Sequence, residues 1–210
     1  MKEQILNSLK ELRSSKERKF DQSIDFILNL KNFDSKKESL NIFVFLPHKV
    51  VDRKVCAFLS KKSKLVETIT KEEFEKFKDK KSIKKLVGDY DFFMASASLM
   101  PTIATKFGRY LGPAGKMPHP QIGIITSDSD DAVKNTIERF NTAIRIITKE
   151  PSIKLRIGRL SMKDGQIADN VMHVFNTLVN ALPKKQENVR SLMIKLTMSK
   201  PIKVKWEQVK

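Results

Sequence analysis

The amino-acid sequence predicts a two-domain protein of mixed α/β and α+β class. In the middle third of the 210-residue chain, strand patterns alternate with helix patterns, which is typical of a three-layer, Rossmann-like α/β domain with a parallel sheet. The two ends of the chain show an α+β pattern and predict one discontinuous domain that the α/β domain interrupts. We place the split α+β domain at residues 1–51 plus 149–210 and the inserted α/β domain at residues 52–148.

The first segment predicts one helix and two strands. Apolar residues fall at helical spacing between charged residues in the range 2–14, which indicates an amphipathic helix. In residues 23–30 every second residue is apolar, and this alternation predicts a strand. A second and more deeply buried strand is expected over residues 41–47.

The middle segment alternates between the two kinds of element. Short apolar runs at residues 55–60 and 90–96 predict buried strands. Thr70 and Glu73 form a capping-box pattern ahead of a charged helix. Two further helices, the second of which opens with Ser and Asp residues suited to a helix N-terminus, are expected over residues 99–107 and 127–144.

The last segment returns to the α+β pattern. A strand is expected over residues 152–158 and is followed by a helix over residues 164–182 with one apolar stripe. Residues 189–198 and 202–206 predict two final strands.

The charge of the chain points to a polyanionic partner. There are 41 Lys and Arg residues against 24 Asp and Glu residues, which gives a formal net charge of +17. The two end segments together hold 23 basic and 12 acidic side chains, whereas the middle holds 18 and 12. Like charges repel and do not help folding, so a phosphate backbone best explains the excess. We expect the split domain to bind the phosphate backbone more strongly than the inserted domain does.

A membrane surface is the alternative polyanion. The longest stretches without a charged side chain, residues 92–105 and 170–183, have 14 residues each and contain polar ones, whereas a spanning helix needs roughly 20 apolar residues. The N-terminus has no apolar core of the signal-peptide kind. The single cysteine, Cys56, cannot form an internal disulfide. We therefore expect a cytoplasmic protein with no membrane partner.

One loop concentrates residues that shape the backbone. The stretch GRYLGPAGKMPHP, residues 108–120, holds three of the seven glycines and three of the eight prolines. It fails as the phosphate loop of nucleotide hydrolases, because Tyr110 replaces the first required glycine and Met117 replaces the hydroxyl residue. Its composition suits a stiff connector, but long irregular loops are often functional, and this one presents Arg109 and Lys116. A phosphate-handling enzyme that uses this loop remains the alternative function.

Other signs of an enzyme are weak. His48, His119 and His173 are scattered, and no zinc-binding, paired-cysteine or nucleophile-elbow motif is present. The acidic run at residues 128–131 suits a helix cap better than a magnesium site. We expect no enzyme activity, hence no catalytic residue, no metal and no cofactor.

Three segments of the chain carry a resemblance to a known family. They are RKFDQSIDFILNLKNFD near the start, LGPAGKMPHP preceded by DYDFFMASASLMP in the middle, and VRSLMIKLTMSKP near the end. In order and spacing they resemble the ribosomal protein L-one family, of archaeal or eukaryotic type, over essentially the whole chain.

The resemblance implies a function in the large ribosomal subunit. The split domain of such a protein binds large-subunit rRNA to form the mobile stalk, and the protein is a monomer within the ribosome. The inserted domain faces the exit-site tRNA and assists release of deacylated tRNA. The surface that binds rRNA also binds the protein's own mRNA and represses its translation.

The resemblance also assigns site residues. Folded RNA is read through its 2′-hydroxyls, phosphates and shape, so short hydroxyl side chains and backbone groups suit it, and cations supply phosphate contacts. By residue type alone, Phe20 fits a core as readily as an interface. The rRNA-binding residues that the resemblance implies are Lys19, Phe20, Gly158, Arg159, Ser191, Thr197, Met198 and Ser199, and those of the tRNA-facing loop are Arg109, Gly112, Gly115 and Lys116.

Two positions depart from the family pattern. Ser199 stands where the family has glycine, and a Cβ there costs up to about 1 kcal/mol if the backbone is left-handed. Ala114 stands where the family usually has arginine, which leaves Arg109 and Lys116 as the cations of the loop. Two further readings remain open: a free translational repressor bound mainly to mRNA, and a general polycation that binds any nucleic acid or a membrane.

Overall fold

The computed structural model covers residues 1–210 and describes all of them except 15–17, 35–37, 39, 78, 149 and 207–210. The chain divides into two compact units, which we call the split unit (residues 1–50 with 142–210) and the inserted unit (residues 51–141). Both contain helices and strands, and the expected mixed α/β class is confirmed.

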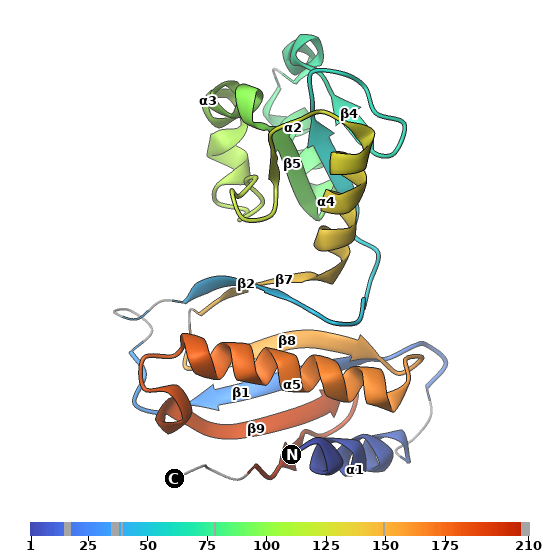
Figure 1. Cartoon of the computed structure of the whole chain (residues 1–210), viewed down its shortest axis with the longest axis vertical. Coiled ribbons are helices and arrows are strands. Elements are labelled where there is room, and N and C mark those ends of the chain that lie inside the picture. The colour runs from blue at the N-terminus through green and yellow to red at the C-terminus, as the bar shows by residue number, and fades with distance from the viewer. Residues whose placement is uncertain (15–17, 35–37, 39, 78, 149, 207–210) are drawn as a thin grey trace. The chain divides into compact units, whose positions relative to one another are not determined.

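The split unit is built on a four-stranded antiparallel sheet in the order β10-β9-β1-β8 (Figure 1). The strand from the start of the chain lies between two strands from its end, so hydrogen bonds join the two ends of the sequence along both edges of that strand. The strands are β1 (Ser23–Leu30), β8 (Ser152–Arg159), β9 (Val189–Leu196) and β10 (Ile202–Val204).

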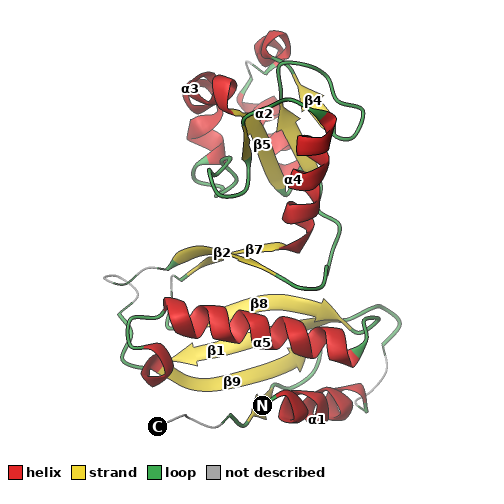
Figure 2. Ribbon diagram, in the orientation of Figure 1, coloured by secondary structure: helices red, strands yellow, loops and turns green. Residues whose placement is uncertain are grey.

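Helices α1 (Lys2–Arg13) and α5 (Asp164–Ala181) pack against one face of this sheet (Figure 2). Burial alternates along β1, as its sequence pattern predicts. The buried set of β1 lies beneath the helices, and the half-buried set lies on the opposite face, which we call the open face. The buried set is Ile24, Phe26, Leu28 and Leu30, and the half-buried set is Ser23, Asp25, Ile27 and Asn29.

A β-bulge in β8 sets which of its side chains reach the open face. The register against β1 shifts so that Ile157 is an extra residue between Arg156 and Gly158. Ile157 and Gly158 are both buried, and a Cβ added at Gly158 would lie 3.1 Å from Cγ1 of Ile167 on α5. Because the bulge absorbs one residue, Arg159 returns to the open face together with Arg156.

Strands β2 (Asn41–Phe45) and β7 (Ala143–Ile147) form a separate antiparallel ribbon. The sequence missed β7, because Phe140 and Ile144 continue the helical spacing of the preceding segment. Pairing with β2 ends the helix, and residues 142–148 belong to the split unit, whereas the expected boundary is at residue 149.

Asn170 on α5 anchors the segment that follows β2. Its side chain is fully buried and makes three hydrogen bonds. The amide group donates to the backbone oxygens of His48 and Ile157, each at 3.0 Å, and its oxygen accepts the His48 N–H at 3.0 Å. A buried amide is tolerated only when it is satisfied in this way, so the segment around His48 is fixed to the split unit.

The inserted unit contains a four-stranded parallel sheet in the order β4-β3-β5-β6. Its strands are short, and the two at its centre are mostly buried, as expected for a sheet covered on both faces. They are β3 (Val55–Phe58), β4 (Glu67–Ile69), β5 (Phe92–Ser96) and β6 (Ile124–Ile125).

Helices cover both faces of this parallel sheet, which gives three layers. On one face, Phe58 and Phe93 pack into a core with α2 (Lys80–Asp89) and α3 (Met100–Leu111). The next side chain along β5, Phe92, points to the opposite face and stacks on Phe140 of α4 (Asp130–Thr142), with 4.8 Å between ring centroids.

The helix expected after Thr70 begins as a 3-10 helix, η1 (Lys71–Lys76), and α2 follows as a separate element. Thr70 and Glu73 form the predicted capping box. Phe74 of η1 and Phe77, its C-terminal cap residue, both contact Phe107 of α3, at centroid distances of 5.4 and 6.1 Å.

The two long uncharged stretches lie inside these units. Residues 92–105 form β5 and the beginning of α3, and residues 170–183 form the larger part of α5, whose apolar stripe is buried against the sheet. No helix in the described part of the chain has the length and apolar character needed to cross a membrane.

Candidate nucleic-acid interface

Residues from both ends of the chain meet beside the sheet of the split unit. Phe20, Arg159 and Thr197, which the resemblance assigns to RNA binding, line one open pocket. They come from the segment before β1, the end of β8 and the segment after β9. We call it the Phe20–Thr197 pocket, and its lining is completed by Asp21, Ser23 and Arg156.

Thr197 is held in place by Ser23. Its Oγ1 accepts the backbone N–H of Ser23 at 3.1 Å, and the two side-chain hydroxyls lie 2.9 Å apart in a further hydrogen bond. The backbone N–H of Thr197 donates to the carbonyl oxygen of Ser23 at 3.1 Å. The strand pairing is thus extended one residue past β9, and the exposed threonine is presented in a fixed position.

Two large apolar side chains near Thr197 are exposed to solvent. Phe20 is 52% exposed and Met198 is 61% exposed. The alternative in which Phe20 belongs to a core is therefore wrong. An exposed aromatic ring beside cations is suited to stacking on a base or a ribose.

Arg159 keeps donors for a ligand. Its Nη1 lies 3.7 Å from Oδ2 of Asp21, and both side chains are partly exposed, so the pair is weak. Asp21 is occupied mainly by Ser161, whose N–H and hydroxyl donate to it at 3.1 and 2.9 Å. The guanidinium, with its five N–H donors, therefore remains able to bind a phosphate.

The turn after β9 accommodates Ser199 without backbone strain. The N–H of Ser199 donates to the carbonyl oxygen of Leu196 at 3.1 Å, and its hydroxyl accepts the N–H of Leu196 at 2.9 Å. The described non-glycine residues with positive φ are Asn32 and Lys185, so Ser199 is not left-handed and its Cβ carries no such strain. The serine hydroxyl closes the turn that presents Thr197 and Met198.

Ser191 lies further along the open face, in a polar row across three strands. Its hydroxyl accepts from Nδ2 of Asn29 at 3.0 Å, and Oδ1 of Asn29 accepts the hydroxyl of Ser152 at 2.9 Å. Ser191 is only 9% exposed. An RNA group that reaches Ser191 therefore meets the whole polar row.

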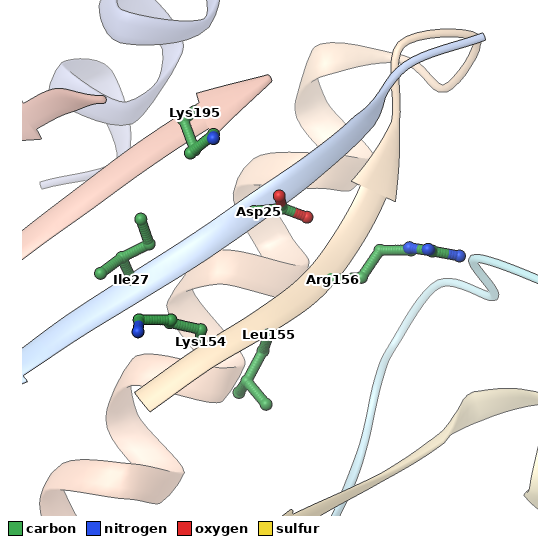
Figure 3. Close-up of a pocket in the computed structure, with 6 residues that line it drawn as sticks. All are labelled: Asp25, Ile27, Lys154, Leu155, Arg156 and Lys195. Atoms are coloured by element: carbon green, nitrogen blue, oxygen red, sulfur yellow. The ribbon is translucent and has the colours of Figure 1, made fainter. Parts of the chain in front are cut away.

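A second pocket lies on the open face between the Phe20–Thr197 pocket and the polar row (Figure 3). Asp25 lies opposite Arg156 on one side and Lys195 on the other, and Ile27 lies opposite Lys154. Two cationic residues thus flank Asp25 on the neighbouring strands, and a third, Lys154, lines the same partly apolar pocket. The lining residues are Asp25, Ile27, Lys154, Leu155, Arg156 and Lys195, so Arg156 belongs to both pockets.

Two other assigned residues differ in their exposure. Lys19 is exposed in the segment before β1, next to Phe20. Gly158 is buried and faces α5, where an added Cβ would lie 3.1 Å from Cγ1 of Ile167. Its absent side chain thus lets α5 approach β8, and its expected RNA contact stays a prediction.

The 108–120 loop differs from expectation at Lys116. The Lys116 ammonium donates to the carbonyl oxygens of Val87 and Tyr90, at 2.6 and 2.7 Å. These oxygens lie in the last turn and at the C-terminal cap of α2, where orphan carbonyls and the helix dipole favour a cation. The structure uses the Lys116 ammonium to fix the loop to α2, and the expected contact with tRNA phosphates stays a prediction.

The other assigned residues of this loop end helix α3. Gly112 is the C-terminal cap residue, and Gly115 has a φ of 68°, which glycine adopts without strain. The N–H groups of Gly115 and Lys116 donate to the oxygens of Gly112 and Leu111, at 2.9 and 3.0 Å. Because these donors are used inside the loop, they do not form the cradle that a phosphate-handling enzyme needs. Arg109 is exposed.

The acidic run joins the start of α4 to the segment that follows β3. Asp128 accepts the N–H of Ser60 at 3.0 Å, and Asp130 accepts the hydroxyl of Ser63 at 2.9 Å. Within the described residues, no group of three or more His, Cys, Asp or Glu side chains gathers in a way that suits a metal ion.

Several interface residues were not assigned from the sequence. Ser23 and Asp25 alternate with the buried residues of β1 and therefore lie on its other face. Arg156 and Lys195 belong to the last segment, which has an excess of positive charge. The alternation was therefore a usable signal for the open face. The strand register that brings Asp25 between Arg156 and Lys195 could not be predicted from the sequence.

Comparison with known proteins shows the family of the chain. The model of the Ribosomal protein L1p/L10e family matches residues 12–200. Three archaeal relatives, each named large ribosomal subunit protein uL1 and none named as an enzyme, are similar over nearly their whole length. That of Pyrobaculum calidifontis is 34% identical over 99% of this chain and 96% of its own. That of Thermofilum pendens is 36% identical over 94% and 90%, and that of Methanocaldococcus jannaschii is 34% identical over 100% and 98%. The chain therefore belongs to the Ribosomal protein L1p/L10e family.

Proposed function

We propose that this protein is a structural component of the large ribosomal subunit and binds large-subunit rRNA with the split unit. The observation that carries the proposal is the Phe20–Thr197 pocket, in which segments from both chain ends present an exposed aromatic ring, a fixed hydroxyl and two arginines. Family membership supports the ribosomal assignment.

The pocket residues divide the work of RNA recognition by their chemistry. Phe20 stacks on a base or packs on a ribose, and Thr197 meets a 2′-hydroxyl or a base edge. Arg156 and Arg159 bind phosphates through their planar guanidinium groups, which position the RNA. Asp25 is an acceptor for a 2′-hydroxyl or a base amino group, and its two cationic neighbours keep the surface attractive to RNA.

The distribution of charge favours the same unit. Residues 1–50 with 142–210 hold 24 basic and 12 acidic side chains, and residues 51–141 hold 17 and 12. The split unit is thus the more positive of the two. A phosphate backbone gains from this excess through the release of condensed counterions.

A salt-resolved binding titration tests the rRNA proposal. The probe is a fragment of the large-subunit rRNA stalk, and a DNA duplex of equal length is the control. We expect the stalk RNA to remain bound at salt concentrations that release the DNA, because part of its affinity is not electrostatic. Equal affinities for the two nucleic acids at every salt concentration would contradict specific rRNA binding and favour a general polycation.

The inserted unit is proposed to face the exit-site tRNA and to assist release of deacylated tRNA. Arg109 in the last turn of α3 and the exposed lysines of α2 support this role by their charge; those lysines are Lys80, Lys81, Lys84 and Lys85. Arg109→Glu should slow tRNA release from reconstituted ribosomes and leave the Kd for stalk RNA unchanged. A normal release rate would remove Arg109 from the proposal.

Repression of the protein's own mRNA is proposed to use the rRNA surface. One surface implies competition, so stalk RNA should displace a fragment from the start of this mRNA at the concentration set by its own Kd. Simultaneous binding of both RNAs to one protein molecule would show two separate sites.

A further inference from the structure

A second basic cluster lies at the other end of the strands that carry the Phe20–Thr197 pocket. It is formed by the residues that follow β1 and those around the start of β9, and all its side chains are exposed. We call it the basic knuckle, and it consists of Lys31, Lys184, Lys185 and Arg190.

A buried asparagine holds the two segments of the knuckle together. Asn188 is fully buried, and its Nδ2 donates to the carbonyl oxygens of Lys31 and Asn32, each at 3.1 Å. Its Oδ1 accepts the N–H of Lys184 at 2.8 Å, and its backbone oxygen accepts the N–H of Lys31 at 2.8 Å. A fully satisfied buried amide is a rigid link, so the spacing of the lysine backbones is fixed.

The backbone of the knuckle is unusual. Among the described non-glycine residues, only Asn32 and Lys185 have a positive φ, at 52° and 49°, and both flank contacts made by Asn188. Asparagine adopts this conformation readily, whereas lysine does so against a steric preference. Strained backbone of this kind tends to occur where the direction of a side chain serves a function.

A β-bulge directs the arginine of the knuckle. Along the β1–β9 pair, Asn29 lies opposite Ser191 and Leu30 lies opposite Val189, so Arg190 is the extra residue of β9. Bulges re-aim a side chain out of the regular alternation. Arg190 is exposed although both its neighbours in sequence are buried.

The cations of the knuckle are not neutralised by ion pairs. Within the described residues, no carboxylate lies within 4.0 Å of the charged groups of Lys31, Lys184, Lys185 or Arg190. The acidic residues of these segments are Asp34 and Glu187, both exposed. Four cations against two carboxylates, held on a rigid frame, fit a regular polyanion.

We propose that the basic knuckle binds phosphates of the same RNA that occupies the Phe20–Thr197 pocket, so that the RNA lies along β9. The inference rests on the proposed rRNA binding and deepens it by setting the extent of the contact. Arg190 and Thr197 are seven positions apart in the sequence, which is about 23 Å along a strand. The open face between them carries Lys195 and the polar row of Ser191, so the path is lined with groups that RNA binds.

The two ends of this contact have different signatures. Phosphate contacts by lysine and arginine act through counterion release, so removing them lowers the salt dependence of binding. A stacking ring and a fixed hydroxyl act at every salt concentration. The knuckle thus sets salt-sensitive affinity, whereas the pocket sets specificity.

The test uses the full chain with Lys31→Gln, Lys185→Gln and Arg190→Gln combined. The matched control combines Lys80→Gln, Lys81→Gln and Lys84→Gln, which removes the same charge from exposed positions of α2 in the inserted unit. The probe is the stalk RNA fragment, and log Kd is measured against log salt concentration. Circular dichroism and thermal melting establish that each variant is folded.

We expect the slope for the knuckle variant to fall by about 2 to 3 relative to the wild type. Its line should meet the wild-type line at high salt, where Phe20→Ala stays weaker than both. The control should change the slope by less than one. A knuckle variant with the wild-type slope, or a control that changes the slope as much, would overturn the inference.

The length of the RNA provides an independent readout. Stalk fragments shortened from one end should bind wild type and knuckle variant equally once they no longer span about 23 Å. If the variant loses affinity equally with every length, the knuckle contact along β9 is wrong. Failure of the wild type to prefer stalk RNA over duplex DNA would instead defeat the proposed function itself, so the two failures are distinguishable.

Discussion

Ser23 and Thr197, which lie 174 positions apart in the sequence, are joined by reciprocal hydrogen bonds. The N–H of Ser23 donates to Oγ1 of Thr197, and the N–H of Thr197 donates to the carbonyl oxygen of Ser23, both at 3.1 Å. A threonine side chain thus takes the place of a strand carbonyl where β9 has ended. The pair ties the segment that carries Phe20 to the turn that carries Met198.

Replacing Thr197 with valine removes this hydroxyl with little change of shape. We expect Thr197→Val to weaken binding of stalk RNA by about 1–3 kcal/mol and to lower the free energy of unfolding by about 0.5–1.5 kcal/mol. RNA titration and urea denaturation measure the two effects. Thr197→Ser keeps the hydroxyl and is the control. If valine binds RNA as tightly as serine does, Thr197 has only a structural role.

Phe20→Ala tests the exposed ring. Since the side chain is 52% exposed, its removal should leave the melting temperature within a degree or two. RNA binding should weaken by about 1–3 kcal/mol through lost stacking, and Phe20→Trp should retain most of it. A loss of stability that matches the loss of RNA affinity would show that Phe20 belongs to the fold.

The fold was largely predictable because burial follows the sequence pattern. The alternation in residues 23–30 coincides with β1, and the apolar stripe in residues 164–182 coincides with α5. The strand β7 was missed because Phe140 and Ile144 continue the helical spacing of the preceding segment, whereas pairing with β2 makes the residues after Thr142 a strand. The local sequence pattern does not reveal which strand a segment will pair with.

The site was predictable only in part, because residue type does not reveal whether a side chain is already bound by other groups of the protein. Lys116 lies in a Gly- and Pro-rich loop and has the character of a free cation, yet its ammonium is held by two carbonyls of a helix end 26 and 29 residues away. Gly158 was assigned to RNA, and the structure shows in addition that it packs closely against Ile167. The local sequence pattern reveals neither contact.

Lys116→Ala should therefore act on stability. Two carbonyl oxygens lose a charged donor, and we expect the free energy of unfolding of the inserted unit to fall by about 1–3 kcal/mol. The Kd for stalk RNA should not change. Arg109→Ala, at an exposed position of the same region, is the control and should leave stability unchanged. Equal stability of the two variants would contradict the structural role of Lys116.

Gly158→Ala tests the contact between β8 and α5. A Cβ at 3.1 Å from Cγ1 of Ile167 forces a shift, and we expect a loss of about 1 kcal/mol or more in unfolding free energy. Gly165→Ala is the matched control, since a Cβ on that helical residue meets nothing within 4 Å; it should be neutral or stabilising. A neutral Gly158→Ala would show that α5 moves without cost.

Asp169 gives the split unit an acid-sensitive contact. The Lys2 ammonium, which hydrogen-bonds its Oδ1 at 2.6 Å, holds the pKa of Asp169 below its usual value, and His48 adds to the effect. Because the folded pKa is the lower one, the contact stabilises the protein above about pH 4 and is lost as the pH falls through the folded pKa.

Melting temperatures at pH 5 and pH 3 test this contact in the wild type and in Asp169→Asn. The wild type should lose slightly more stability on acidification than the variant does, because an exposed pair contributes little. Parallel losses in the two proteins would show that the Lys2 contact does not stabilise the folded state.

The central position of β1 between β8 and β9 has a consequence for the timing of synthesis. A ribosome makes β1 long before β8 and β9, so the newly made β1 has neither sheet partner while the inserted unit is being synthesised. The Phe20–Thr197 pocket needs residues from all three segments, so it forms only after residue 197 has been added. Any binding that depends on this pocket therefore comes late in synthesis.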